Sequence, residues 1–205
     1  YVGGESDSWV EDALKNATNE NMTVINLIEL LGEEVLEEET VAGMQSEEHD
    51  HEEGEEHSHE GEKDEHIWLS LKNAVAICGH IAEKLSEIDA ENKDIYKANA
   101  DSYIEKLNTL NKEYTEAVTT SAYNTIVVAD RFPFRYLVDE YNLNYYAAFS
   151  GCSTETQASF ETVIFLSDKL EENKLGAVIV TESSDGSVAN TVISNTADKN
   201  QKVLA

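Results

Sequence analysis

Histidine and acidic residues alternate through one short stretch, residues 46–67, which reads SEEHDHEEGEEHSHEGEKDEHI. Five histidines and eleven acidic residues stand there beside a single lysine. Imidazole nitrogen is the usual ligand of zinc and related divalent metals, and carboxylates add oxygen ligands and a negative field. The composition therefore predicts that this stretch attracts and holds metal cations.

The spacing of the histidines allows chelation within the stretch. His49 and His51 are two residues apart, as are His57 and His59, and each pair can chelate a metal when the chain is extended. Residues 45–65 are highly charged and lack apolar periodicity, which is typical of a mobile surface loop. A solvated, variable loop without a metal role remains the alternative.

The charge of the chain excludes some partners. The 205 residues carry a formal net charge of −28, with 42 acidic residues against 14 lysines and arginines. Such a chain repels other polyanions, so nucleic acid and anionic membrane surfaces are poor partners. No apolar run approaches the roughly 18 residues of a membrane span. The chain starts at Tyr1 without Met and ends in what reads as mid-strand, so we expect an internal piece of a longer protein.

Periodic apolar residues predict the elements of the first half. We expect helices over residues 5–17, 71–86 and about 92–121, the last on the order of 45 Å long at 1.5 Å per residue. The run NMTVINLIELL, residues 21–31, is predicted to be a strand passing into a short turn. Because a helix of 45 Å exceeds the width of a small domain, we expect the last helix to bridge two lobes.

Strands and helices alternate in the second half. Apolar runs predict strands over residues 125–129, 145–149, 177–181 and 202–204, and helices over residues 134–141, 160–173 and 188–196. This alternation predicts a parallel sheet covered on both faces. Such sheets place ligands at the carboxyl ends of their strands, where Asp130, Cys152 and Glu182 stand. Ordinary strand-ending loops are the alternative.

The segment DEHIWLSLKNA, residues 64–74, resembles part of the solute-binding proteins of zinc and manganese ABC transporters. In that family an Asp-x-His-x-Trp-Leu run follows a His-rich acidic loop. The resemblance continues in YKANADSYIEKLNTL (residues 96–110), DRFPFRYLVDEYNLNYYAAFSGCSTETQAS (residues 130–159) and VIVTESSDGSVANTV (residues 178–192).

The resemblance implies a two-lobed α/β fold like that of periplasmic binding proteins, with a long linking helix. We therefore expect an N-terminal lobe over residues 1–91 that carries the acidic loop 45–65. The linking helix is expected over residues 92–122, and a C-terminal lobe over residues 123–205. One metal ion would lie between the lobes.

The resemblance also implies a ligand set. His66 stands at the family's first-lobe histidine position. The second-lobe position falls on Arg131, whose guanidinium cannot bind a metal, with Asp130 one residue before. Either Asp130 supplies an oxygen ligand, or it and Arg131 tie down the turn at Pro133; both interpretations stay open. Further family ligands would precede Tyr1 and follow Ala205.

The remaining candidates have weaker roles. By the same resemblance, His49, His51, His57 and His59 would collect extra zinc with low affinity. A thiolate at Cys152 would favour a soft metal such as zinc, and Glu182 would lie near the ligands without binding the metal. Cys78 is expected to be a buried residue that packs against apolar neighbours, and His80 is expected to have no function.

The function that the resemblance implies is an extracytoplasmic receptor, monomeric and without catalysis, that captures zinc for the membrane permease of an ABC transporter. It would lie in the periplasm or be lipid-anchored to the outer face of a bacterial membrane. A manganese or iron receptor, or a surface adhesin or interaction protein that has lost tight metal binding, is the alternative. A metallohydrolase is disfavoured, because the chain lacks a His-Glu-x-x-His motif, a Gly-x-Ser-x-Gly elbow and a phosphate-binding glycine loop.

Overall fold

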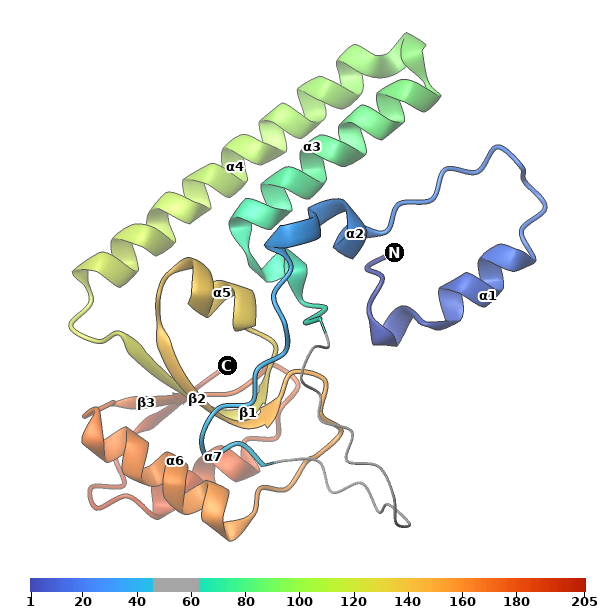
Figure 1. The fold of residues 1–205 in the computed structure, drawn as a ribbon. Helices are drawn as coiled ribbons and strands as arrows, with labels where there is room; N and C mark the ends of the chain where they lie inside the picture. Colours follow the sequence, from blue (N-terminus) through green and yellow to red (C-terminus); the bar gives the residue numbers. More distant parts are fainter. Residues whose placement is uncertain (46–62) are drawn as a thin grey trace. The chain divides into compact units, whose positions relative to one another are not determined.

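The computed structural model describes residues 1–45 and 63–205, which divide into two compact units (Figure 1). Unit 1 combines Tyr1–Glu37 with Lys63–Ala117, and the described part of unit 2 combines residues 38–45 with Val118–Ala205. In this division most of the longest helix counts with unit 1. The expectation of a separate linking segment over residues 92–122 stays a prediction.

Unit 1 is helical. Its elements are the 3-10 turn η1 (Glu5–Asp7), α1 (Trp9–Lys15), α2 (Leu27–Leu31), the 3-10 turns η2 (Gly32–Glu34) and η3 (Ile67–Leu69), α3 (Leu71–Ile88), the 3-10 turn η4 (Ala90–Asn92) and α4 (Lys93–Thr120), whose last three residues count with unit 2. The helices predicted over residues 71–86 and 92–121 are confirmed, and the one predicted over residues 5–17 is divided between η1 and α1.

The strand predicted over residues 21–31 is wrong, because its second half forms helix α2. The side chain of Asn26 caps this helix by accepting a hydrogen bond from the Glu29 amide at 3.2 Å. A cap satisfies one of the amide groups that a helix start leaves unpaired. Ile28 and Leu31, three residues apart, are both buried, as on one face of a helix.

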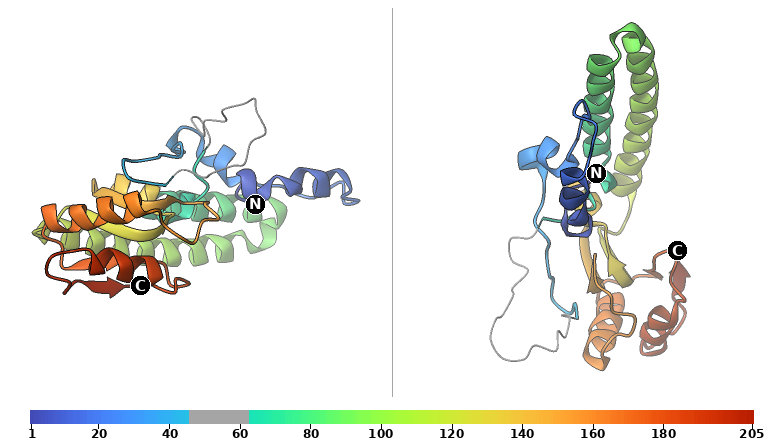
Figure 2. Two further views of the ribbon diagram at one scale, coloured as in Figure 1. Left: turned by 90° about the horizontal axis from the view of Figure 1, so that it is seen from below. Right: turned by 90° about the vertical axis from the view of Figure 1, so that its right-hand side faces the viewer.

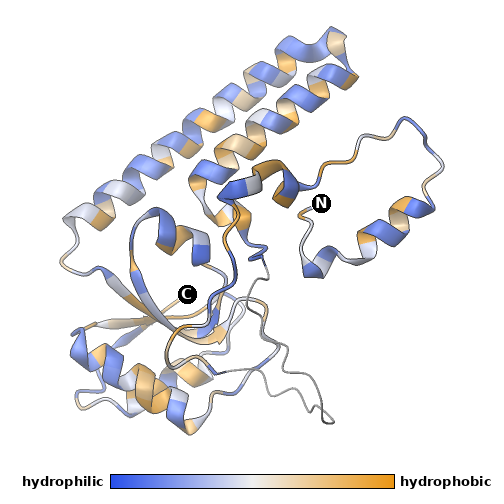
Figure 3. Ribbon diagram, in the orientation of Figure 1, coloured by the Kyte–Doolittle hydropathy of each residue, from blue (hydrophilic) through white to orange (hydrophobic). Residues whose placement is uncertain are grey.

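Helices α3 and α4 run antiparallel and side by side, with η4 between them (Figures 1 and 2). Ser70 caps α3, since its hydroxyl accepts a hydrogen bond from the Asn73 amide at 3.1 Å. Leu107 is the one buried residue of α4, and most of this helix is hydrophilic (Figure 3). Within the described part of the chain, every helix is too short or too polar to cross a membrane.

Unit 2 is built on a parallel sheet, as predicted. Its strands are β1 (Thr125–Phe132), β2 (Asn144–Ser150), β3 (Ala177–Ile179) and β4 (Lys202–Leu204), in the order β2-β1-β3-β4. Its helices are α5 (Arg135–Glu140), α6 (Phe160–Glu172) and α7 (Ser187–Ser194). Strand β1 runs three residues beyond its predicted end at Ala129, and its pairing with β2 shifts register between Val128 and Arg131.

Side chains of β1 alternate between two hydrophobic cores, because neighbouring residues of a strand point to opposite faces. Val127 and Ala129 belong to the core that contains the buried residues of α6 and α7. Val128 belongs to the second core, together with Val138 of α5 and Ala147 of β2. Helices therefore cover both faces of the sheet, which holds the ends of β1 and β3 in fixed positions.

Candidate metal centre

His66 lies in unit 1, directly before η3. Its side chain is 16% exposed, and its ring contacts the ring of Trp68 with centroids 5.6 Å apart. The next residue, Ile67, is fully buried and anchors the turn. His66 is therefore held at the surface of a fixed element with part of its ring accessible.

The carboxylate of Asp64 holds both the backbone and the ring of His66. Asp64 Oδ1 accepts a hydrogen bond from the His66 amide at 2.8 Å and lies 3.0 Å from His66 Nδ1. Asp64 is only 3% exposed, and its own amide donates to the Leu36 carbonyl at 2.9 Å. A hydrogen bond at this contact requires the ring proton on Nδ1, because an ionised carboxylate can only accept, and Nε2 then carries the lone pair.

Glu65 fixes the same segment from the other side. It is 7% exposed, and its Oε1 accepts a hydrogen bond from the Ser6 amide at 2.7 Å, while the Ser6 hydroxyl donates to Oε2. A Cβ atom at Gly4 would collide with the Glu65 side chain, so the absence of a side chain there permits the approach. Two buried carboxylates thus flank the backbone that leads into His66.

The sequence reasoning missed the roles of Asp64 and Glu65, which it counted among the acidic residues of a metal-collecting stretch. A signal for Asp64 was available in the sequence. An aspartate side chain often accepts a hydrogen bond from the amide two residues further on, in an Asx turn, and Asp64 does so with the amide of His66. Nothing in the local sequence marks Glu65, whose partner Ser6 lies 59 positions away.

Asp130 lies in unit 2, near the carboxyl end of β1, and its carboxylate is engaged on both oxygens. Oδ1 accepts a hydrogen bond from the Arg131 amide at 2.8 Å. Oδ2 accepts from the Thr181 amide at 3.0 Å and from the Thr181 hydroxyl at 2.5 Å. These bonds bring the carboxyl ends of β1 and β3 together, since Thr181 follows β3.

The hydrogen bonds also set the charge state of Asp130. Burial alone would raise the pKa of its carboxyl group, but the hydrogen bonds from Thr181, Arg131 and Ser184 outweigh it, and the pKa lies below its ordinary value. Asp130 is therefore an anion near neutral pH, as a metal ligand must be. The two Thr181 donors, however, connect β1 to the segment that follows β3, which is a structural role.

The other predicted residues are placed as follows. Arg131 and Glu182 are exposed in unit 2, and the Cys152 thiol is exposed there too. In unit 1, His80 is exposed, and half-burial raises the pKa of the Cys78 thiol. His49, His51, His57 and His59 lie outside the described residues. Among residues 1–45 and 63–205, no three His, Cys, Asp or Glu side chains gather in a metal-binding group.

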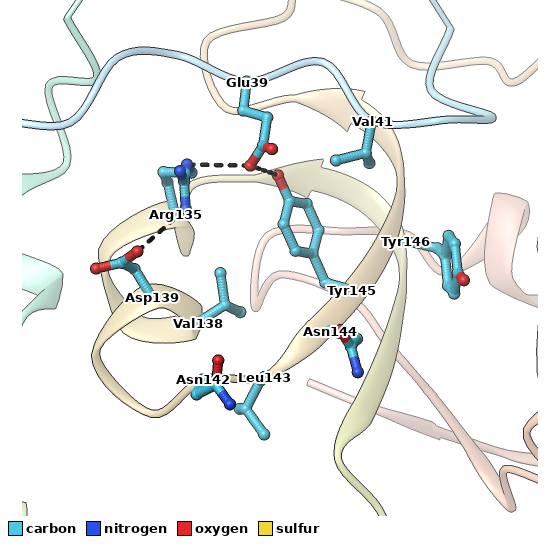
Figure 4. Close-up of a pocket in the computed structure, with 10 residues that line it drawn as sticks. All are labelled: Glu39, Val41, Arg135, Val138, Asp139, Asn142, Leu143, Asn144, Tyr145 and Tyr146. Atoms are coloured by element: carbon cyan, nitrogen blue, oxygen red, sulfur yellow. Dashed lines mark hydrogen bonds and ion pairs between the residues drawn. The ribbon is translucent and has the colours of Figure 1, made fainter.

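A pocket of about 390 Å³ lies within unit 2, between the segment after Glu38 and the elements α5 and β2 (Figure 4). Glu39 Oε2 forms an ion pair with Arg135 Nε at 3.2 Å and accepts a hydrogen bond from the Tyr145 hydroxyl at 3.1 Å. Arg135 also approaches Asp139, with 3.8 Å between Nη1 and Oδ1. The charges at the pocket are paired with one another and indicate no ligand class.

The whole chain, residues 1–205, matches the family described as zinc-uptake complex component A, periplasmic (ZnuA). The zinc-binding lipoprotein AdcA of Streptococcus pneumoniae is 30% identical over 192 residues, which cover 94% of this chain and 36% of that protein. The chain thus spans about a third of the length of this curated relative.

Two solved structures share the fold. The Zn(II)-bound ZnuA-like domain of Streptococcus pneumoniae AdcA is 26% identical, with a TM-score of 0.63 over 97% of this chain and 64% of that chain. A crystal structure of ZnuA, 23% identical, has a TM-score of 0.70 over 97% of this chain and 66% of that chain.

These similarities confirm the predicted fold class, a two-lobed α/β fold of the periplasmic-binding-protein type with a long helix. They also confirm the family that was inferred from the Asp-x-His-x-Trp-Leu run and the segments after it. The chain belongs to the ZnuA family, the periplasmic component A of zinc-uptake complexes.

Proposed function

We propose that this protein captures divalent zinc outside the cytoplasm and delivers it to the membrane permease of an ABC transporter. The observation that carries the proposal is the presentation of His66, whose Nδ1 lies 3.0 Å from a buried carboxylate, so that Nε2 is the ring nitrogen we propose for zinc. A neutral imidazole fixed in this way is a suitable zinc ligand. The family and the name of the AdcA relative support zinc as the cargo.

The ligand set that we propose combines residues of unequal affinity. His66 supplies a nitrogen ligand on a fixed element, and Asp130 is the weaker candidate for an oxygen ligand, because both of its oxygens already accept hydrogen bonds. His49, His51, His57 and His59 would bind additional zinc weakly and raise its concentration near the receptor. Affinity would come from ligands that the fold holds in place, without any covalent change to the cargo.

The setting follows from the same role. Component A of a zinc-uptake complex serves transport, so we propose no catalytic activity, and the partner is a permease. The protein would act as a monomer, in the periplasm or attached by a lipid to the outer face of the membrane. Its net charge of −28 disfavours nucleic acid as a partner.

Calorimetric titration of the full-length protein with zinc and with manganese tests this proposal. We expect one zinc site with a dissociation constant below about 1 μM and weaker binding of manganese, because nitrogen-rich coordination favours zinc. Tighter binding of manganese would favour the manganese or iron receptor. Absence of any submicromolar zinc site would contradict the proposal.

A matched variant separates the two kinds of site. Replacing His49, His51, His57 and His59 together by Gln should remove the weak zinc sites and leave the tight one, since His66 is untouched. Loss of the tight site in this variant would show that the loop histidines, and not His66, hold the cargo.

A second candidate function is an adhesin or interaction protein that keeps the fold without tight metal binding. Arg131, exposed at the position where the family resemblance expects a ligand, is the observation that favours it. Unchanged zinc affinity in His66→Ala would support this function over the receptor.

A further inference from the structure

We propose that Asp64 is a positioning residue, which sets the tautomer of the His66 ring so that Nε2 is presented to the metal. The inference rests on the proposed function, because it assigns how His66 is prepared for zinc. Asp64 itself would not touch the ion. Its effect would pass entirely through the ring of His66.

The geometry gives Asp64 control over both the direction and the protonation of the ring. One oxygen, Oδ1, lies 2.8 Å from the His66 amide and 3.0 Å from Nδ1, so the same atom fixes the backbone and the ring. The two ring nitrogens of a neutral histidine share one proton. The hydrogen bond that one nitrogen makes therefore determines whether the other can bind a metal. A carboxylate at Nδ1 therefore stabilises the Nδ1–H form, in which the lone pair lies on Nε2.

Burial makes this control strong. The Asp64 side chain is 5% exposed, so water competes little for its oxygens, and charge-assisted hydrogen bonds are stronger than neutral ones. The backbone of Asp64 is fixed as well, by its bond to Leu36 and by the bridge between Glu37 and Lys63. These contacts fix the backbone that carries the Asp64 carboxylate.

His80 offers a contrast within the same unit. Its Nδ1 lies 3.6 Å from Glu83 Oε2, beyond hydrogen-bond length, and its side chain is 49% exposed. The carboxylate contact of His80 is thus longer and more exposed than the contact between Asp64 and His66. His80 is the natural internal reference for a measurement on His66.

Glu65 offers a matched control beside Asp64. It is also a buried carboxylate, but its oxygens bind Ser6 rather than the ring of His66. Removing its charge by Glu65→Gln should loosen the segment without changing the tautomer. A change of tautomer that occurs in the Asp64 variants but not in Glu65→Gln is then specific to Asp64. It cannot be a general effect of removing a buried carboxylate.

The test is ¹⁵N NMR of the histidine rings in the full-length, metal-free protein at about pH 8.5, roughly two units above the ordinary histidine pKa. The His66 signals are assigned by their loss in His66→Ala. We expect His66 to be predominantly Nδ1–H in the wild type and in Glu65→Gln. In Asp64→Ala we expect a shift toward Nε2–H, the form that His80 should show throughout.

Asp64→Asn guards against misfolding, because its amide oxygen can still accept the bond from the His66 amide. It should fold and show a weaker preference for Nδ1–H than the wild type, since a neutral oxygen is the poorer acceptor. A wild-type His66 that is mainly Nε2–H would overturn the proposal without any variant. An unchanged tautomer in Asp64→Ala would overturn it as well.

Zinc competition against a chromophoric chelator completes the test. Removing a partner of this kind lowers metal affinity by about 10- to 100-fold, so we expect that loss in Asp64→Ala and less than about 10-fold in Asp64→Asn. An Asp64→Ala protein with wild-type affinity would contradict positioning. If His66→Ala kept full zinc affinity, the proposed receptor site would fail, and the NMR result would still show whether Asp64 sets the tautomer.

Discussion

The two candidate ligands that the structure describes, His66 in unit 1 and Asp130 in unit 2, are held in opposite ways. A carboxylate contacts His66 through one ring nitrogen, Nδ1, and the other ring nitrogen, Nε2, is the one we propose for the metal. Asp130 accepts hydrogen bonds on both oxygens, from Arg131 and Thr181. The first arrangement prepares an atom for a ligand, whereas the second uses its atoms to join two strands.

A polar residue at a strand end is a weak indicator of a metal site when its oxygens already accept hydrogen bonds. A residue that keeps one coordinating atom accessible is a stronger indicator. A metal ion at Asp130 would compete with three hydrogen-bond donors, which the fold places within 3.0 Å. A metal ion at His66 Nε2 would leave the bond to Asp64 intact. We therefore expect changes at the two residues to separate metal affinity from stability.

The largest effect is expected for His66→Ala. Loss of a direct ligand should exceed the loss of a partner behind it, so we expect zinc affinity to fall by at least about 100-fold. Chelator competition measures this change. His80→Ala, on the exposed face of α3, is the control and should stay within about twofold of the wild type. Equal losses of zinc affinity in His66→Ala and His80→Ala would show that His66 is not a specific zinc ligand.

The next effect is a loss of stability in Asp130→Ala. Hydrogen bonds to a charged group contribute about 1.5–3 kcal/mol when buried, and Asp130 is partly exposed, so we expect the free energy of unfolding to fall by about 1–2 kcal/mol. Chemical denaturation measures it. Thr181→Val, which keeps the amide donor, should lose less. Zinc affinity should change by less than about threefold in both.

The opposite pattern would make Asp130 a ligand. A drop in zinc affinity of about tenfold or more in Asp130→Ala, with normal affinity in Thr181→Val, would place the carboxylate on the metal.

A smaller effect is expected in the pH dependence of stability. The folded-state pKa of Asp130 is lowered, because its hydrogen bonds outweigh the opposing effect of burial. A carboxyl group of this kind adds stability that is present above its unfolded pKa, about 3.9, and is lost as the pH falls through the folded pKa. Asp130→Asn should therefore lose less stability than the wild type between about pH 5 and pH 2. The free energy of unfolding is measured against pH by chemical denaturation. An equal loss of stability in the two proteins over this pH range would contradict the prediction.

The smallest effect is expected at the ion pair in the pocket of unit 2. The Arg135 and Glu39 side chains are 22% and 45% exposed, and ion pairs with such exposure contribute about 0.2–1 kcal/mol. A double-mutant cycle with Arg135→Gln and Glu39→Gln should return a coupling in this range. This coupling energy is expected to be smaller than the stability lost in Asp130→Ala. A larger coupling energy would reverse the order of the two effects.

Much of the fold could be predicted from local patterns. Apolar residues at spacings of three and four indicate α3 and α4, and short apolar runs indicate the parallel strands. The error at α2 arose because an apolar run such as NLIELL fits both a strand and a helix. The missed signal was Asn26 followed by Glu29 three residues later, a typical helix start.

The candidate site was predictable only in part. The Asp-x-His-x-Trp-Leu run led to His66, and strand ends led to Asp130. The contacts of Glu65 with Ser6 and of Asp130 with Thr181 join residues 59 and 51 positions apart, which no local pattern encodes. Such contacts depend on how the elements pack. They decide whether a polar residue binds a ligand or fastens the fold.

A crystal structure of the zinc-loaded full-length protein, with anomalous scattering recorded at the zinc edge, tests the central claim most directly. We predict an ion about 2.0–2.1 Å from His66 Nε2, with Asp64 still bonded to Nδ1 and Asp130 still bonded to Thr181. A zinc ion bound through Nδ1, or zinc in the protein with none at His66, would contradict the account.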